Sequence, residues 1–265
     1  MRIELEGLPN TRDLGGIKTK DGKTIKYKKL LRSGQLFFAT ENDKNILLND
    51  YNLGLIVDFR SIDEQKEKPD PTLPDVKYVY NPVMREITKG ITRDEKSDKD
   101  TIKMIIVDMA DDLERAEKYM EDIYESLIND DYALTQYGKF IDLLLENKDK
   151  ASLWHCTAGK DRAGFATFLV LECLGVDKET IIEDYLLTNK YVQKDVETMI
   201  KSIKSEYDLP NVDDVVKALF GIKRIYLENV YNTIQEKYGN MSEFLKVKIN
   251  VTDEKLKTMR ELFLE

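Results

Sequence analysis

The chain has 265 residues, 42% hydrophobic and 34% charged, which is the balance of a folded globular protein and not of a disordered one. Its formal net charge of −9 argues against general binding to nucleic acid or to an anionic membrane surface, although a small basic pocket can still take an anionic substrate. Two cysteines are too few for a disulfide framework, and no stretch approaches the length of a membrane span. We therefore expect no stable membrane insertion and a cytoplasmic location by default, or secretion if a signal peptide once preceded this sequence.

The first third of the chain predicts a loop, a hairpin and the first strands of a sheet. Residues 10–16 are polar and end in two glycines, which is typical of a structured loop. Residues 17–27 fit a hairpin that turns at Asp21-Gly22. Strands are predicted where short apolar runs occur, at residues 30–32, 55–59, 76–80 and 152–155. The run at 55–59 is compact enough for a buried parallel strand.

Helices are predicted wherever apolar residues recur every three or four positions. Thr40 to Asp43 fits a capping box that starts the first helix, and Gly54 closes it. The later helices are expected at residues 113–127, 133–144, 163–174, 179–191, 196–207, 222–237 and 253–263. The charged stretch 88–100 is expected to be a mobile loop. Strands and helices alternate without a clear boundary, which predicts one α/β domain, 1–265, with a central, mainly parallel sheet flanked by helices.

The segment from His155 to Gly164 carries the chemistry. It reads His-Cys-Thr-Ala-Gly-Lys-Asp-Arg-Ala-Gly, and it follows a predicted strand and opens a predicted helix. Unpaired N–H groups and the positive dipole end of a helix N-terminus can hold one phosphate there, and the same field favours a thiolate at Cys156. Arg162 can return to that phosphate with a planar fork that matches two oxygens. Gly159 permits the tight loop.

These residues resemble the signature loop of the cysteine-phosphatase superfamily, which includes tyrosine, dual-specificity and phosphoinositide phosphatases. The Gly-Lys-Asp-Arg core is similar to that of the bacterial tyrosine phosphatases that also act on phosphoinositides. Further segments resemble motifs of that subgroup, namely residues 10–16, 32–34, 57–60 with Glu64 and Pro69-Asp70 downstream, 184–189 and the tail from 251. The resemblance covers most of the chain and is weakest between residues 81 and 150.

The resemblance implies the cysteine-phosphatase fold and a two-step hydrolysis of phosphate monoesters, in which Cys156 forms a phosphocysteine that water then hydrolyses. The substrate would be a phosphorylated protein, phosphotyrosine above all, or a phosphoinositide. No metal and no organic cofactor is implied. Asp161 is expected to be the general acid, because a leaving phenolate or alkoxide needs a proton. Other acids remain open as alternatives for this role, namely Asp58, Asp94, Asp98 and Asp100. A helical insertion at residues 191–220 is expected to act as a lid.

The remaining residues of the loop and its surroundings are expected to bind the substrate or to support the loop. Substrate-binding positions are expected within the loop itself, at Thr157, Ala158, Gly159, Lys160 and Ala163. The charge of Lys160 suits a substrate with more than one phosphate. Supporting roles are expected outside these positions, for His155, Arg12, Asp13, Asp58 and Arg60. Arg12, Asp13 and Arg60 either brace the loop through ion pairs or contact the substrate directly.

One departure from the superfamily pattern leaves a second function open. Many members have Ser or Thr after the arginine, where the hydroxyl helps the thiolate to leave, and here the residue is Ala163. The alternative is therefore a phosphate-recognition module with little turnover. A sulfur or arsenate reaction on the same thiolate is a weaker option. A zinc site is disfavoured, because one His and two Cys lack paired ligand spacing, and a nucleotide P-loop is disfavoured because Asp161 follows Gly159-Lys160.

Overall fold

The computed structural model describes residues 1–84 and 98–265, with the side chains of 98–102 left aside. Its described strands form a five-stranded sheet in the order β1-β2-β5-β3-β4. The strands are β1 (Arg12–Asp13), β2 (Leu30–Ser33), β3 (Leu53–Asp58), β4 (Lys77–Tyr80) and β5 (Ala151–His155). Only the short edge strand β1 is antiparallel to its neighbour among these five. The predicted α/β class and mainly parallel sheet are confirmed.

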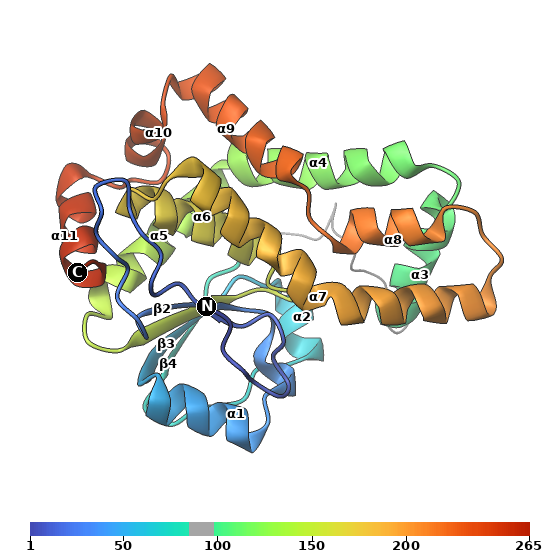
Figure 1. The fold of residues 1–265 in the computed structure, drawn as a ribbon, viewed down its shortest axis with the longest axis horizontal. Coiled ribbons are helices and arrows are strands. Elements are labelled where there is room, and N and C mark those ends of the chain that lie inside the picture. The colour runs from blue at the N-terminus through green and yellow to red at the C-terminus, as the bar shows by residue number, and fades with distance from the viewer. Residues whose placement is uncertain (85–97) are drawn as a thin grey trace.

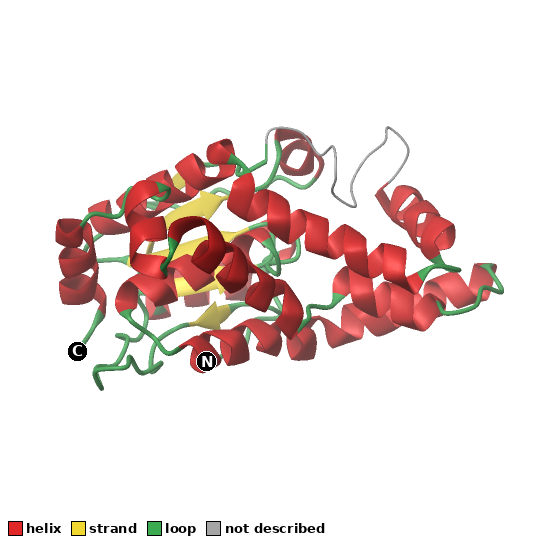
Figure 2. Ribbon diagram, turned by 90° about the horizontal axis from the view of Figure 1, so that it is seen from above, coloured by secondary structure: helices red, strands yellow, loops and turns green. Residues whose placement is uncertain are grey.

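The described helices follow and separate these strands. They are η1 (Leu36–Phe38), α1 (Glu41–Asn45), η2 (Ile46–Asp50), α2 (Ile62–Glu67), α3 (Asp98–Met109), α4 (Leu113–Asn129), α5 (Asp131–Glu146), α6 (Arg162–Leu174), α7 (Lys178–Glu206), α8 (Val212–Phe220), α9 (Arg224–Tyr238), α10 (Met241–Val247) and α11 (Asp253–Phe263). Figure 2 shows helices on both sides of the sheet, so that its strands run through the interior.

Alternate residues of the central strands enter two separate apolar cores. Val57 of β3 and Trp154 of β5 belong to the larger core, which α4, α5 and α6 cover. Ile56 and Leu153, their neighbours along the chain, belong to the smaller core beneath the N-terminal segment and η2. Successive side chains of a strand point to opposite faces, so a sheet covered on both sides needs a continuous apolar run. That requirement explains the compact apolar runs of the sequence.

The strand register brings three strand ends to one place. Ser33 at the end of β2 and Asp58 at the end of β3 both pair in register with His155 at the end of β5. All three strands are parallel, so their carboxyl ends meet at one edge of the sheet. Ligands of open α/β sheets bind at this edge, and here it is where the His155–Gly164 segment begins.

Two predicted helix boundaries were wrong. The capping box at Thr40 is present, because its side chain accepts a hydrogen bond from the Asp43 backbone. The helical segment ends at Asp50, and Gly54, which was expected to close it, lies inside β3. The turn between them is made by Asn52, at φ +50°. Asn tolerates this left-handed conformation through its short polar side chain.

The predicted helices at 179–191 and 196–207 form one continuous helix, α7. No Gly or Pro interrupts residues 192–195, so nothing stops the helix there. Helix α10 was not predicted, although Asn240 caps it by accepting a hydrogen bond from Glu243. The predicted hairpin at 17–27 turns at Gly22, which has φ +84°. Its arms are joined by an isolated bridge between Lys18 and Thr24 and by backbone hydrogen bonds from Thr19 to Lys23 and from Ile25 to Ile17. Of the predicted loop 88–100, residues 88–97 lie outside the described residues, and residues 98–100 begin α3.

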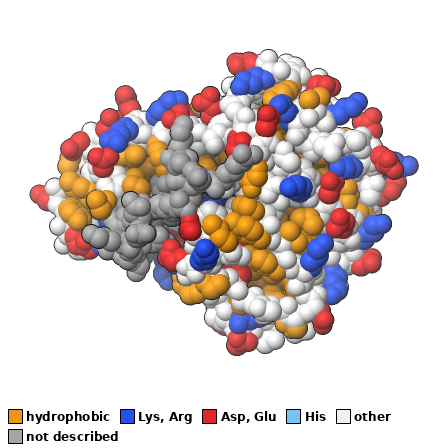
Figure 3. Space-filling view, turned by 180° about the vertical axis from the view of Figure 1, so that it is seen from behind, with side chains coloured by type: hydrophobic (Ala, Val, Ile, Leu, Met, Phe, Trp, Pro, Cys, Tyr) orange, Lys and Arg blue, Asp and Glu red, His pale blue; other side chains and the backbone are white. Residues whose placement is uncertain are grey.

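The second half of α7 extends beyond the sheet together with α8 (Figure 1). Helix α8 packs against α7, α4 and α3. No helix in the described part of the chain is both long enough and apolar enough to cross a membrane. Figure 3 shows acidic and basic side chains interspersed over one face, with apolar side chains gathered between them.

Candidate active site

The signature loop, residues 156–161, joins the end of β5 to the start of α6. Cys156 is its first residue and is almost completely buried, and α6 begins at Arg162. Gly159 has φ +71°, and a Cβ there would lie 2.5 Å from the carbonyl oxygen of Ser33, so a side chain does not fit. The Cys156 thiol therefore lies beside a helix N-terminus, whose N–H groups and dipole favour an anion.

Arg162 is held by a carboxylate from another element. Its Nη1 donates to Glu64 Oε2 at 2.7 Å and its Nη2 to Glu64 Oε1 at 2.8 Å, while the Thr157 hydroxyl also donates to Glu64. Burial alone would raise the pKa of Glu64, but the charge and hydrogen bonds of Arg162 outweigh it and lower that pKa to about 2. Glu64 thus stays ionised and fixes the orientation of the arginine fork beside the loop.

Asp161 is the last residue of the signature loop and it contacts a pair of tyrosines. Its Oδ1 accepts a hydrogen bond from the Tyr124 hydroxyl at 2.9 Å, and that hydroxyl accepts one from Tyr185 at 2.6 Å. Burial, and then the charge of Asp161, raise the pKa of Tyr124 well above its usual value. Tyr124 therefore remains a neutral donor that fixes one oxygen of the Asp161 carboxyl group.

The other candidates for the general acid are Asp58, Asp94, Asp98 and Asp100. Asp58 is fully buried, and its carboxylate accepts hydrogen bonds from Arg60 and from the Tyr78 hydroxyl. Asp94 lies outside the described residues, and Asp98 and Asp100 are described by their backbone alone, at the start of α3. The assignment of the general acid to Asp161 stays a prediction.

Lys160 is buried, and its ammonium contacts groups within the protein. Its Nζ donates to the carbonyl oxygens of Leu219 at 2.6 Å and of Gly221 at 3.4 Å, at the end of α8, and lies 3.4 Å from Asp161 Oδ2. These contacts connect the signature loop to the end of α8. The predicted role of Lys160 in binding a second phosphate stays a prediction, and it requires this ammonium to exchange the two carbonyls for substrate.

A buried cluster of two arginines and one aspartate supports the outer side of the loop. Arg12 and Arg32 both pair with Asp184 of α7, at 3.4 Å and 3.0 Å. Arg32 also donates to a backbone carbonyl of the loop, and Arg12 donates to Asn10, whose amide donates to the carbonyl of Ala158. Burial, and then the neighbouring Arg12 charge, lower the pKa of Arg32 to about 10. These contacts favour the bracing role of Arg12.

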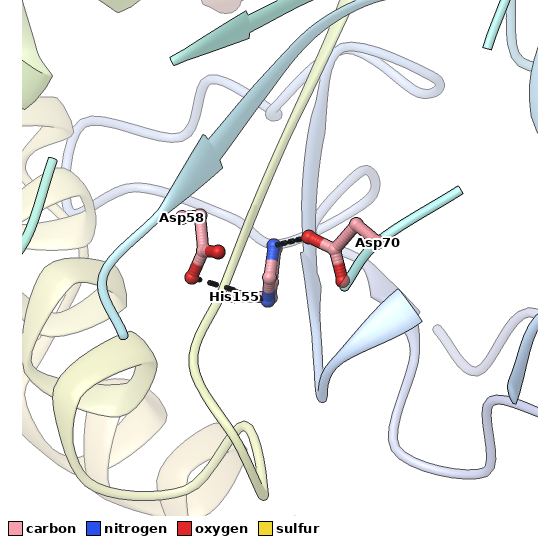
Figure 4. A group of neighbouring side chains, drawn as sticks. All are labelled: Asp58, Asp70 and His155. Atoms are coloured by element: carbon pink, nitrogen blue, oxygen red, sulfur yellow. Dashed lines mark ion pairs between the residues drawn. The ribbon is translucent and has the colours of Figure 1, made fainter. Parts of the chain in front are cut away.

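His155 lies between two carboxylates (Figure 4). Its Nε2 is 2.8 Å from Asp70 Oδ2, and its Nδ1 is 3.8 Å from Asp58 Oδ1 and 3.2 Å from the Cys156 carbonyl oxygen. Burial lowers the pKa of His155, but Asp58 and Asp70 outweigh it and raise that pKa. These three side chains could ligate a metal ion, yet Arg60 already pairs with both carboxylates, at 2.8 and 3.0 Å. The negative charges of Asp58 and Asp70 are therefore balanced by Arg60. The two carboxylates fix the orientation of His155, the residue before Cys156.

The other predicted residues have distinct positions. Asp13 accepts hydrogen bonds from the backbone N–H groups of Gly15 and Lys28, so it holds the N-terminal loop together. Ala158 is exposed on the signature loop, whereas Ala163 is fully buried in the first turn of α6. The Ala163 methyl group therefore faces the core, and only its backbone can take part in phosphate binding.

Sequence reasoning assigned no role to several residues that hold the site together. They are Glu64, Asp70, Arg32, Asp184 and Tyr124. The first four lie in or beside segments that resemble motifs of the subgroup, but that resemblance did not indicate what each residue does. Tyr124 had no such signal, because it lies on an α4 face that reads as ordinary helical core.

The fold and the loop together define an α/β protein of the cysteine-phosphatase class. The family model described as "Tyrosine phosphatase family" matches residues 3–265, so the chain belongs to that family and is a phosphatase.

Curated relatives agree with this assignment. The chain is 26% identical over 266 residues to the triple specificity protein phosphatase PtpB of Mycobacterium tuberculosis, covering 92% of each chain. It is 24% identical over 250 residues to a putative tyrosine-protein phosphatase of Cupriavidus necator, covering 94% of this chain and 84% of that one. A tyrosine-protein phosphatase of Nostoc commune is 26% identical over 163 residues, which is 62% of this chain and 49% of the relative.

Proposed function

We propose that the chain hydrolyses phosphate monoesters through a phosphocysteine, with phosphotyrosine in proteins as the preferred substrate. The observation that carries this proposal is the position of Cys156 between the end of β5 and the N-terminus of α6, with Arg162 fixed beside it. A thiolate at this position is stabilised by the helix dipole and by the guanidinium. Arg162 pairs with two phosphate oxygens and stabilises their charge as the transition state develops.

In the first step, the Cys156 sulfur attacks phosphorus and forms the S–P bond while the ester P–O bond breaks. Asp161 gives its proton to the leaving oxygen, so the product is a neutral phenol or alcohol. In the second step, water attacks phosphorus and gives a proton to the Asp161 carboxylate. The S–P bond then breaks, which releases inorganic phosphate and restores the thiolate.

The proposed substrate range extends beyond phosphotyrosine. Dual specificity for phosphoserine and phosphothreonine, and activity on phosphoinositides, follow from the loop resemblance and from the name of the PtpB relative. Lys160 would serve a second phosphate only by leaving the carbonyls at the end of α8. We therefore rank phosphotyrosine first and phosphoinositides last.

Phosphate release by wild type, Cys156→Ser and Arg162→Lys tests the proposal, on a phosphotyrosine peptide, a phosphothreonine peptide and a dispersed phosphoinositide. We expect release by wild type only, with both variants keeping the wild-type melting temperature within a few degrees. Wild type that binds these ligands but releases no phosphate would instead support the recognition module. A Cys156→Ser variant that retains full activity would exclude the thiolate mechanism.

We also propose that residues 191–220 form a lid over the site. Val192, Val196 and Met199 of α7 and Phe220 of α8 line a pocket beside the loop residue Ala158, which supports this proposal. Hydrogen exchange should show faster opening of this helix pair than of α6, which is almost entirely buried. Equal protection of the two regions would contradict a moving lid.

A further inference from the structure

A cavity of about 240 Å³ lies directly beside the signature loop. One wall is the segment Gly7–Asn10, and the opposite wall is the apolar side of α7 with Phe220 at the end of α8. Thr157 and Ala158 border it, whereas Cys156 and Arg162 are not among the described residues that line it. The cavity is therefore adjacent to the place where the phosphate binds and distinct from it. It is smaller than the pockets of drug-sized ligands, so its size suits one side chain.

The wall formed by residues 7–10, with residues 34 and 35 beside it, is fixed relative to Cys156, whereas the wall formed by α7 and α8 belongs to the proposed lid. The Asn10 amide donates to the Ala158 carbonyl at 3.0 Å, and the Gln35 backbone N–H donates to the Thr157 carbonyl at 3.0 Å. A Cβ on Gly34 would lie 3.2 Å from the same Thr157 carbonyl, so the two segments are in close contact. A group that packs against this wall is thus held at a constant distance from Cys156, and its binding energy can help to orient the substrate.

The lining of the cavity selects the chemistry of its occupant. Leu8, Phe38, Val196 and Met199 give it an apolar character, and Asp195 is the only charged residue among the described residues that line it. A carboxylate repels a second phosphate and an acidic side chain at close range. The cavity therefore favours an apolar group over a charged anionic one.

We propose that this cavity seats a large apolar side chain next to the phosphotyrosine of a peptide substrate, and that it makes the enzyme selective among phosphoproteins. This inference rests on the proposed phosphatase function. Burying a leucine side chain corresponds to about 10- to 100-fold in binding. The partly open cavity should give the lower end of that range, about tenfold in kcat/KM.

The inference is tested with phosphotyrosine peptides in which Leu, Ala or Asp is placed in turn at each of the three positions on either side of the phosphotyrosine. For wild type, we expect one position where Leu exceeds Ala by about tenfold in kcat/KM and where Asp is the poorest. Val196→Trp fills the cavity, so the Leu preference at that position should fall below about twofold. Lys190→Trp adds the same bulk to an exposed position of the same helix outside both the cavity and the proposed lid, and it should keep both the activity and the preference.

The outcomes separate the subsite from the function on which it rests. If wild type does not hydrolyse a small aryl phosphate at all, the phosphatase proposal itself is refuted. Full activity without any flanking preference would refute only the subsite. If Val196→Trp instead lowers hydrolysis of a phosphoinositide vesicle but not of its water-soluble headgroup, and no peptide preference exists, then the cavity takes an acyl chain and the peptide proposal is wrong.

Discussion

Replacing Glu64 with Gln removes the negative partner of Arg162 while keeping the size of the side chain. Glu64 is 8% exposed, and its pKa falls from 4.5 to about 2 on folding, since the Arg162 interactions outweigh the opposing effect of burial. A difference of about 2.5 pKa units corresponds to about 3 kcal/mol. We expect Glu64→Gln to lower the free energy of unfolding by about that amount at pH 7, because an ionised guanidinium then lacks its buried counter-charge.

The loss of stability in Glu64→Gln should depend on pH. A carboxyl group with a lowered folded-state pKa contributes its full stabilisation above the unfolded pKa of 4.5, and loses it as the pH falls through about 2. The difference between wild type and Glu64→Gln should therefore shrink from about 3 kcal/mol at pH 7 to roughly 1 kcal/mol at pH 3.

Urea unfolding at pH 7, 5 and 3 measures this difference. Glu67→Gln is the matched control, because Glu67 lies on the same helix, is partly exposed and pairs with Lys68 at 3.5 Å. It should change stability by less than about 0.5 kcal/mol at each pH. A Glu64→Gln variant within 0.5 kcal/mol of wild type at pH 7, or a difference that is constant with pH, would refute the reasoning.

Three other substitutions probe the site. Tyr124→Phe removes a hydrogen-bond donor to Asp161, so kcat for alkyl phosphates should fall about tenfold and kcat for p-nitrophenyl phosphate much less; an equal loss for both would contradict the role of Asp161 as acid. Gly159→Ala should cost about 1–3 kcal/mol in chemical denaturation and most of the activity, because its positive φ and a backbone contact exclude a Cβ; wild-type stability would be inconsistent with this loop geometry. Asp184→Asn leaves two buried arginines without a counter-charge and should cost about 3 kcal/mol by the same assay, whereas a loss below 0.5 kcal/mol would show that these ion pairs are not needed.

The sequence alone located the strand–loop–helix segment to which we assign the chemistry. A strand, a Gly-containing loop and a helix follow one another within about a dozen residues around Cys156, so local pattern fixes their order and the approach of Arg162. Apolar runs likewise predicted the central strands, because a strand buried on both faces has to be apolar at every position. The helix boundaries at Gly54 and between residues 191 and 196 were wrong, since turn and break positions depend on weak local preferences.

Only the tertiary structure decided which distant charges meet. Glu64 reaches Arg162 across 98 positions of sequence, and Asp184 reaches Arg12 across 172, because the strand order and the packing of the helices bring these segments together. The direction of Lys160 toward the end of α8 has the same origin. Local periodicity records which face of an element is buried, but the partner of a buried charge is set by how the elements pack. Residue type therefore indicated the reaction, and packing determined the contacts that hold its groups in place.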